Sequence, residues 1–479
     1  MDIFGFGDDD PMEESDPEEG RDSDALRRYR RRLNSSDDAD ADALPHNVEV
    51  LESLTEICID KEEFDYAIRF CNQWLRFAPY SSQAWLRKGI ALLGLEIPDK
   101  ALDCFDQADL LNPMDTESMI YRGLAFSQME MPGQALKVYQ QALELEPDNE
   151  DAIFNMALAF QQMNRHEKAI AVFRTLLSSE RYAHDVTFEL GLALKNLGRF
   201  EEALQVYTGY LDIDPFNPSA WFARGLMLSE LGRLQQGIEC YQMSIAIRED
   251  FYPAWVNRGN NLASMGSLLE AVESYWEALR HDPRDGKAWC GLGNCYQELE
   301  EDYDKALQYF ARSLECKPGF REALFGRGSC FEALGQYQRA LENYDAALRN
   351  DADDVELLIA RGDVLSLLER AEEALVCYRR VVELTPDNSE IWIEVALILY
   401  GQKNFEESLQ AYDTVIRLDP ECGEAYYGRA RNQLALGQYQ ATVQSLQMAI
   451  AVDPSLIEVL KLEFPRIAGA VALDDQEPS

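Results

Sequence analysis

Prolines recur along this sequence at one fixed spacing. Nine of them are separated by 34 residues or a multiple of 34, with one interval a residue longer: Pro79, Pro113, Pro147, Pro215, Pro283, Pro318, Pro386, Pro420 and Pro454. When each proline is set at position 32 of a 34-residue unit, twelve units follow one another from Val48 to about Leu456. A period of this length predicts a repeat array, in which each unit buries its apolar side only against its neighbours.

Other positions of the unit also keep one kind of residue. Position 8 is glycine or alanine in eleven of the twelve units and position 20 is mostly alanine, whereas position 24 is aromatic in most units: Phe105, Tyr139, Phe173, Tyr207, Tyr241, Tyr275, Phe310, Tyr344, Tyr378 and Tyr412. Position 4 carries Trp85, Trp221, Trp255, Trp289 and Trp392. This pattern predicts two amphipathic helices per unit, which approach closely at the small residues while the bulky ones fill the space beside them.

The signals between these helices agree with the pattern. Leu-Gly pairs such as Leu231-Gly232 predict a left-handed turn between the two helices of a unit, and the closing Asp-Pro ends the second helix. The pattern W-x3-G…A-x3-Y…P at period 34 resembles the tetratricopeptide repeat (TPR) family, over roughly 85% of the chain. The resemblance implies an all-α fold, a right-handed alpha-alpha superhelical solenoid of about twelve 34-residue helix pairs.

The regions outside the repeats differ in composition. Residues 1–47 are rich in acids and poor in apolar residues, which predicts a disordered acidic tail, yet the tail holds a basic block at Arg27–Arg32. That block could be a solvated segment, a lid on the chain's own acidic groove, or a contact to nucleic acid or membrane. Residues 48–456 form the twelve repeats, and residues 457–479 are expected to form a C-terminal capping helix and a short tail.

The charge limits the choice of partner. The chain has 86 acidic and 44 basic residues and a formal net charge of −42. This charge repels nucleic acid and anionic membranes, so the expected partners are other proteins or peptides that are basic or neutral. It also suits a halophilic host, a question that the sequence leaves open. No apolar run is long enough to span a membrane and the N-terminus does not look like a secretory signal, so we expect a cytoplasmic protein without membrane contact.

The resemblance also implies where a ligand would bind. In this family the first helix of each unit lines the concave face, chiefly through positions 2, 5, 9, 12 and 13. Position 5 is almost always apolar here, and position 9 changes from aliphatic in units two to six to polar in units seven to ten. The predicted peptide-binding residues are Phe154, Asn155, Phe188, Phe222, Asn257, Asn260, Asn294, Phe325 and Asp363. Amides can bond both groups of a peptide backbone, although the polarity of position 9 could instead reflect simple exposure.

Charged residues recur at two further positions. Position 2 is acidic in seven units (for example Glu117, Asp151 and Glu356), which fits either a rail for a basic partner or favourable charges at a helix start. Position 7 is basic in seven units and arginine in six of them, and we expect these arginines to pair inside the protein rather than to bind phosphate. No position 5 is lysine, so the resemblance does not extend to the TPR domains that grip the C-terminal carboxylate of chaperone tails.

Signals for catalysis are missing. Cysteines recur at the same slots of different repeats, as Cys104, Cys240 and Cys377 do, which is typical of small core residues and not of metal or disulfide frameworks. No phosphate loop or nucleophile elbow is present. We therefore expect no enzyme, no metal and no cofactor. The function predicted is a protein–protein interaction scaffold; the alternative is an accessory or regulatory subunit that presents clients to a separate enzyme. The partner, the pathway and the oligomeric state stay open.

Overall fold

We describe the chain from a computed structural model, which defines residues 47–299 and 302–463. These residues hold 25 α-helices, α2 to α26, and no strand. The chain divides into two compact units, Met1–Gln236 and Gly237–Ser479, with the boundary inside α13 (Leu234–Ile247). The all-α fold built from successive helix pairs is thus as predicted.

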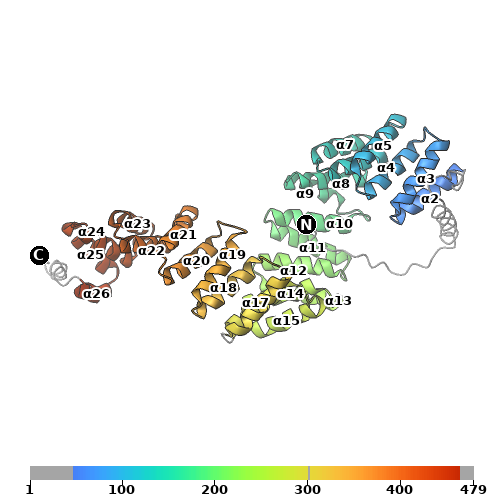
Figure 1. Ribbon diagram of the computed structural model, residues 1–479. Helices are drawn as coiled ribbons and strands as arrows, with labels where there is room; N and C mark the ends of the chain where they lie inside the picture. The colour runs from blue at the N-terminus through green and yellow to red at the C-terminus, as the bar shows by residue number, and fades with distance from the viewer. Residues whose placement is uncertain (1–46, 300–301, 464–479) are drawn as a thin grey trace. The chain divides into compact units, whose positions relative to one another are not determined.

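The first unit contains repeats one to five and the first helix of repeat six. Its helices are α2 (Val48–Asp60), α3 (Phe64–Phe77), α4 (Ser82–Gly94), α5 (Pro98–Leu111), α6 (Thr116–Gln128), α7 (Pro132–Leu145), α8 (Glu150–Gln162), α9 (His166–Phe173), α10 (Ala183–Asn196), α11 (Phe200–Ile213) and α12 (Pro218–Glu230). Figure 1 shows them in blue to green, stacked as successive pairs. Pro98 and Pro132 open their helices, where a missing N–H costs nothing.

The second unit contains repeats seven to twelve. Its helices are α14 (Tyr252–Ser264), α15 (Leu268–His281), α16 (Gly286–Leu299), α17 (Tyr303–Cys316), α18 (Arg321–Ala333), α19 (Tyr337–Leu348), α20 (Val355–Leu367), α21 (Ala371–Leu384), α22 (Ser389–Gly401), α23 (Phe405–Leu418), α24 (Gly423–Ala435), α25 (Tyr439–Val452) and α26 (Leu456–Glu463). Within each unit, helices that follow one another pack together, and so do the first helices of several adjacent repeats, such as α4 with α6 and α16 with α18.

The aromatic residue at position 24 is the centre of each repeat. Tyr275 is 2% exposed, and a Cβ atom on Gly259, at position 8 of the same repeat, would lie 2.7 Å from its ring. Gly291, at position 6 of the next repeat, closes the other side at 2.4 Å. The ring is therefore held between glycines of two successive repeats, which explains why small residues recur beside an aromatic one.

A second link joins each repeat to the one before it. The indole N–H of Trp289 donates to the backbone carbonyl of Pro283, with 3.0 Å between Nε1 and O. All five tryptophans at position 4 make this bond to the carbonyl at position 32 of the preceding repeat. The closing residue has left the helical ladder, so its carbonyl is free to accept, and the bond fixes the start of the next repeat.

The turn between the two helices of a repeat always bends the same way. Residues at position 15 have φ between 56° and 79° in the eleven repeats where the structure describes them. Five are glycines (Gly198, Gly232, Gly266, Gly335 and Gly437), as the Leu-Gly pairs predict, and six are not: Glu62, Glu96, Glu130, Asn164, Glu369 and Lys403. Residues other than glycine are sterically disfavoured at positive φ, so the geometry of the repeat overrides the backbone preference of these six residues.

Repeat four departs from the pattern. Its second helix, α9, stops at Phe173 and continues only as a 3-10 turn, Arg174–Leu176. This repeat has Arg181 in place of the closing proline. Ser179 instead receives the N–H of Tyr182 and donates to the carboxylate of Glu150, so the chain turns early toward α10.

The termini are only partly within the described residues. The predicted acidic tail with its basic block, 1–46, and the segment 464–479 lie outside them, as do residues 300–301 at the predicted one-residue insertion. α26 begins at Leu456 and packs against α25, where the capping helix was expected. The division into 1–47, 48–456 and 457–479 stays a prediction.

Candidate functional site

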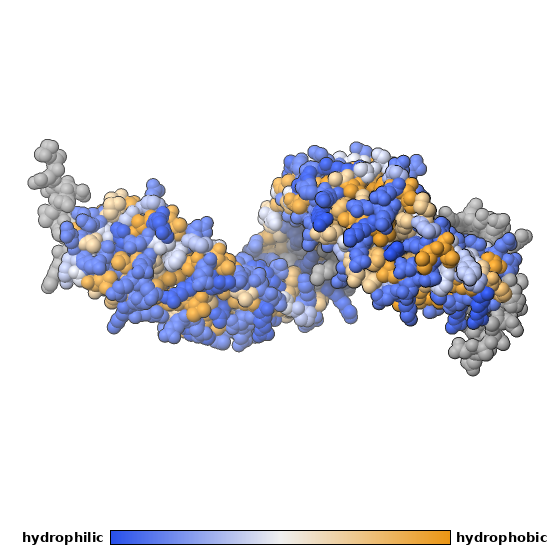
Figure 2. Space-filling view, turned by 90° about the horizontal axis from the view of Figure 1, so that it is seen from above, coloured by the Kyte–Doolittle hydropathy of each residue, from blue (hydrophilic) through white to orange (hydrophobic). Residues whose placement is uncertain are grey.

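The first helices of successive repeats form one continuous surface in each unit, which we call the first-helix face. It comprises α2, α4, α6, α8, α10 and α12 in the first unit, and α14, α16, α18, α20, α22 and α24 in the second. All nine predicted binding residues lie on these helices. Figure 2 shows hydrophilic residues over much of each unit's surface, with hydrophobic patches between them.

Position 9 points outward in the second unit. Asn260, Asn294 and Asp363 are all exposed. Two of them also serve the core: Tyr275 donates its hydroxyl to Asn260 Oδ1 at 2.8 Å, and Tyr378 donates to Asp363 Oδ1 at 2.7 Å. The core therefore explains the polar residues at these two positions, because a buried tyrosine hydroxyl needs a hydrogen-bond acceptor.

Asn294 has no core tyrosine to bond. The residue at position 24 of its repeat is Phe310, which has no hydroxyl. Position 9 of the next repeat is Ser329, which accepts a hydrogen bond from Gln297 at 3.2 Å. Asn294 thus presents an exposed amide that does not accept a hydrogen bond from a core tyrosine.

The other two predicted asparagines each use one side-chain N–H in a hydrogen bond within their own helix. Nδ2 of Asn155 donates to the backbone carbonyl of Asp151, and Nδ2 of Asn257 donates to that of Pro253, both at 2.8 Å. Each amide is half-buried and keeps a second N–H and its oxygen. These side chains can still bond a ligand, although with less freedom than Asn294.

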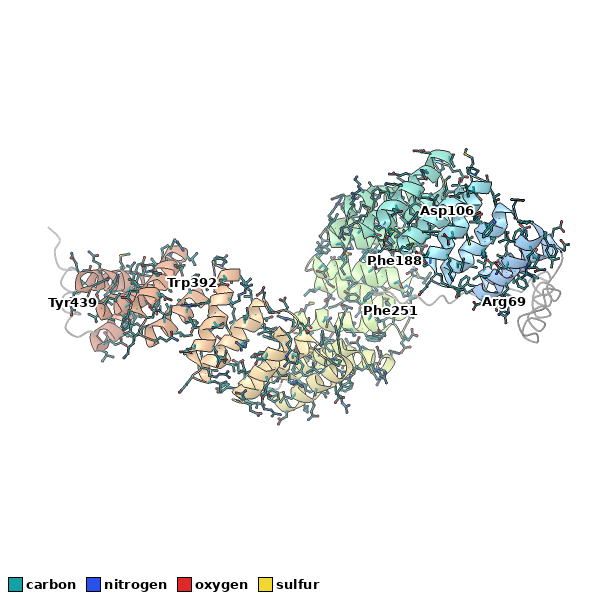
Figure 3. The ribbon with its side chains drawn as sticks, turned by 45° about the horizontal axis from the view of Figure 1, so that its top comes forward. Arg69, Asp106, Phe188, Phe251, Trp392 and Tyr439 are labelled. Atoms are coloured by element: carbon teal, nitrogen blue, oxygen red, sulfur yellow. The ribbon has the colours of Figure 1, made fainter. Side chains whose placement is uncertain are left out.

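The predicted phenylalanines at position 5 form the floor of the first-helix face. Phe154, Phe188 and Phe325 are half-buried, whereas Phe222 is only 7% exposed and offers little surface. Phe188, labelled on α10 in Figure 3, has its ring 4.8 Å from His184 and 5.8 Å from Tyr207, centroid to centroid. Phe154 stacks on Tyr182 at 4.7 Å, and Phe325 lies 5.9 Å from Tyr344. Much of each ring's contact is thus internal.

Carboxylates gather on the first-helix face of repeats nine to twelve. Burial raises the pKa of Glu394, and the nearby charges of Asp363 and Glu424 raise it further. Burial also raises the pKa of Glu332, while its hydrogen bond from Tyr344 acts against this rise. No ion pair is found for these four carboxylates within the part of the chain that the structure describes. These carboxylates therefore lie on the surface without a directly paired cation among the described residues, although Arg431 lies near Glu394 and Glu424 around Tyr412.

Elsewhere the acids of position 2 are matched by cations of the protein itself. Glu117 pairs with Arg87, Asp151 pairs with Arg181, and Glu356 pairs with Arg321 at 2.6 Å. The acidic rail suggested by the sequence is therefore partly neutralised in these repeats.

The arginines of position 7 bond inside the protein, as expected. Arg361 Nε lies 2.7 Å from Asp345 Oδ1 in the preceding repeat, and Arg122 Nη1 lies 2.9 Å from Asp109 Oδ2. Arg327 donates to Asn343 at 2.6 Å. These groups tie first helices to second helices and do not form a free phosphate-binding ladder.

Two grooves lie in the first unit. One, about 390 Å³, runs along the first-helix face and is lined by Phe64, Ile90, Leu93, Gly94, Tyr121, Leu124, Ser127, Gln128 and Gln162. The other, about 380 Å³, opens where α9 is cut short and is lined by residues that include Leu177, Val206, Gly209, Tyr210 and Ile213. The aliphatic residues predicted at position 9 include Ile90 and Leu124 of the first groove. The second groove was not predicted, and the missing proline of repeat four was the one available signal for it.

The described residues hold no group of His, Cys, Asp and Glu side chains that could bind a metal. Eight cysteines are buried, and burial raises the thiol pKa of Cys71, Cys290, Cys295 and Cys330 to about 12. Such thiols stay protonated and unreactive at neutral pH. No helix among the residues described is long and apolar enough to cross a membrane.

Comparison with known families agrees with this architecture. A profile described as "Tetratricopeptide repeat" matches residues 154–218, 188–250, 256–319, 300–355, 325–389, 359–421 and 393–456, and a second, "TPR repeat", matches residues 133–164. The chain belongs to the tetratricopeptide repeat family. TPR folds are scaffolds that bind other proteins or peptides rather than catalytic folds. Repeats one and two lie outside the matched range, although the structure shows the same TPR helix pairs there.

Solved TPR structures resemble parts of the chain or nearly all of it. YrrB, "a TPR protein with an unusual peptide-binding site", is 22% identical over 40% of this chain and 98% of its own, with a TM-score of 0.37. MamA is 17% identical over 35% of this chain and 97% of its own, with a TM-score of 0.33. The APC/C hetero-tetramer Cut9-Hcn1 gives 15% identity over 96% of this chain and 94% of that one, with a TM-score of 0.39. No curated protein sequence matches the chain.

Proposed function

We propose that this TPR protein is a scaffold that binds an extended polypeptide segment on the first-helix face of its second unit. The observation that carries the proposal is the exposed amide of Asn294, which occupies position 9 of its repeat, as Asn260 and Asp363 do in theirs. An amide supplies both a donor and an acceptor, which suits the backbone of an extended peptide. The half-buried ring of Phe325 adds an apolar floor nearby in the repeats that follow.

The partner segment is basic or neutral. The chain carries a net charge of −42, and Asp363, Glu394 and Glu424 lie on the proposed binding face with no ion pair to any described residue. A basic segment relieves this repulsion, and its association rate falls as salt is added. The same negative charge repels an acidic partner or a nucleic acid.

The test is selection of peptides from a random library with the full chain, followed by affinity measurements on variants. Asn294→Ala removes the amide and should weaken a selected peptide by roughly fivefold, the value of one hydrogen bond of about 1 kcal/mol. Asp363→Asn should weaken basic peptides and reduce the salt dependence of their affinity. Gln308→Ala, an exposed amide on the second helix of the repeat of Asn294, is the matched control. Selected peptides that bind both site variants as tightly as the wild type contradict the proposal.

The accessory-subunit alternative makes a different prediction. A protein that presents clients to a separate enzyme should purify with that enzyme when tagged, and the enzyme's turnover of the client should fall when the binding face is altered. A scaffold without such a role binds its client with no catalytic partner present. We place either role in the cytoplasm, and fractionation of the host cell checks this.

A further inference from the structure

We propose that the chain's own segment Leu26–Leu33 binds across the apolar groove of repeats one to four, with its arginines facing Glu62, Glu96 and Glu130. The contact concerns the first unit and is independent of the peptide binding proposed above for the second. Four observations lead to it: the groove, three unexplained glutamates at its edge, the composition of the segment, and the length of chain that joins the two.

The groove is apolar at its floor and open at its edge. Ile90 and Leu93 form part of the floor and are almost fully buried, while Phe64, Tyr121 and Leu124 are half-exposed. Gly94 has no room for a side chain, because a Cβ atom there would lie 2.3 Å from the ring of Phe64. The ring thus fills the end of the groove, and a ligand must lie along the half-exposed side chains.

Three glutamates stand at the edge of this groove, one in each of repeats one to three. The backbone N–H of Glu96 donates to the carbonyl of Leu93, and that of Glu130 donates to the carbonyl of Ser127; both acceptors belong to residues that line the groove. Glu62 occupies the equivalent turn two residues before Phe64. All three are exposed, and each lies two residues from one that lines the groove.

The fold itself disfavours glutamate at these three positions. Each residue has φ of 57° or 58°, where glycine is preferred and occurs in five other repeats. Each also follows the C-terminal end of a first helix, where the helix dipole disfavours a negative charge. No ion pair compensates any of them within residues 47–299 and 302–463. A cation from outside the described residues would offset both penalties in repeats one to three.

The segment Leu26–Leu33 has the matching chemistry. Its sequence is LRRYRRRL, with Leu26, Tyr29 and Leu33 spaced as i, i+3 and i+7 and five arginines between them. As a helix it places the three apolar residues on one face and the arginines around them. An apolar face of this kind suits the apolar groove, and arginines beside it suit the three exposed glutamates, so the segment would match both the apolar and the charged groups.

The connection is long enough. Thirteen residues, 34–46, separate Leu33 from Asn47, which precedes α2 of repeat one. Fully extended they reach at most about 45 Å. Helix α2 has 13 residues and is therefore about 20 Å long, so the segment can pass the first repeat and lie along the groove.

The experiment places a photo-crosslinking amino acid, p-benzoylphenylalanine, at Tyr29 of the full chain and maps the crosslinks by mass spectrometry. We expect crosslinks within one molecule to residues 82–94 and 116–128. The variant E62G/E96G/E130G should lower their yield roughly fivefold to tenfold, because three charge pairs of a few tenths of a kcal/mol each are lost. The yield should also fall at about 1 M salt, where the Debye length is about 3 Å.

The glycine variant separates charge from folding, because it relieves a strained backbone and should not lower the melting temperature. Glu369→Gly, the same change at φ of 58° in repeat ten, is the matched control and should keep the full crosslink yield. A second variant, with the five arginines replaced by glutamine, leaves the repeats untouched and should also lose the crosslinks. Crosslinks elsewhere, crosslinks between two copies, or an undiminished yield in either variant overturn the proposal.

Discussion

The ring of Phe310 lies so close to Gly326 of the next repeat that a Cβ atom on that glycine would stand 2.4 Å from the ring's Cζ atom. Gly326→Ala should therefore force the ring or the helix to move and lower the free energy of unfolding by about 1–3 kcal/mol, measured by chemical denaturation. Gly209→Ala is the control, because a Cβ atom there meets nothing within 4 Å, and a mid-helix alanine should stabilise by up to about 1 kcal/mol. Equal losses in both variants would contradict the contact.

The turn at position 15 predicts opposite effects in two adjacent repeats. Lys403 has φ of 62° and Gly437 has φ of 76°. Lys403→Gly should raise the free energy of unfolding by about 0.5–1 kcal/mol by removing steric strain, and Gly437→Ala should lower it by about 1 kcal/mol. Thermal unfolding of both variants checks the signs; two changes of the same sign would be inconsistent with a left-handed turn.

The indole of Trp392, labelled on α22 in Figure 3, donates to the carbonyl of Pro386 at 3.0 Å. Trp392→Phe keeps an aromatic ring but removes this donor, which should lower stability by about 1 kcal/mol. In a double-mutant cycle, Pro386→Ala retains the carbonyl, so the effect of Trp392→Phe should be nearly unchanged in that background. A much smaller effect there would mean that the ring's packing on proline, and not the bond, carries the energy.

The raised pKa of Glu394 makes stability depend on pH. The fold favours the protonated carboxyl, so the native state binds more protons than the unfolded state between the ordinary value of 4.5 and the raised value. Stability should therefore fall as the pH rises through that interval. Glu394→Gln should stabilise the protein at pH 7 by about 0.5 kcal/mol and flatten this dependence. Glu390→Gln, an exposed change on the same helix, should do neither.

Much of the fold follows from the repeat itself. Tyr275 at position 24 and Gly259 at position 8 are predictable as neighbours, because each repeat carries the same small and large pair at the same spacing. The early end of α9 was not predictable. It depends on Ser179 bonding Glu150 and Tyr182, which are contacts between residues that the helical pattern treats as ordinary surface positions.

The candidate site was less accessible to sequence reasoning. Asn260 and Asn294 occupy the same slot, yet Asn260 serves a core tyrosine and Asn294 does not, since the difference lies in whether position 24 carries a hydroxyl. The shared backbone conformation of Glu62, Glu96 and Glu130 was hidden for another reason. A glutamate in a turn appears unremarkable until its backbone conformation is known.

The sharing of each position-24 ring has a consequence for how the protein comes apart. Tyr275 packs on glycines of two successive repeats, so unfolding of one repeat exposes the position-24 ring of the repeat before it to solvent. Disorder that begins at one end should thus advance ring by ring, and a chain cut between repeats should lose order inward from the cut and not only at it.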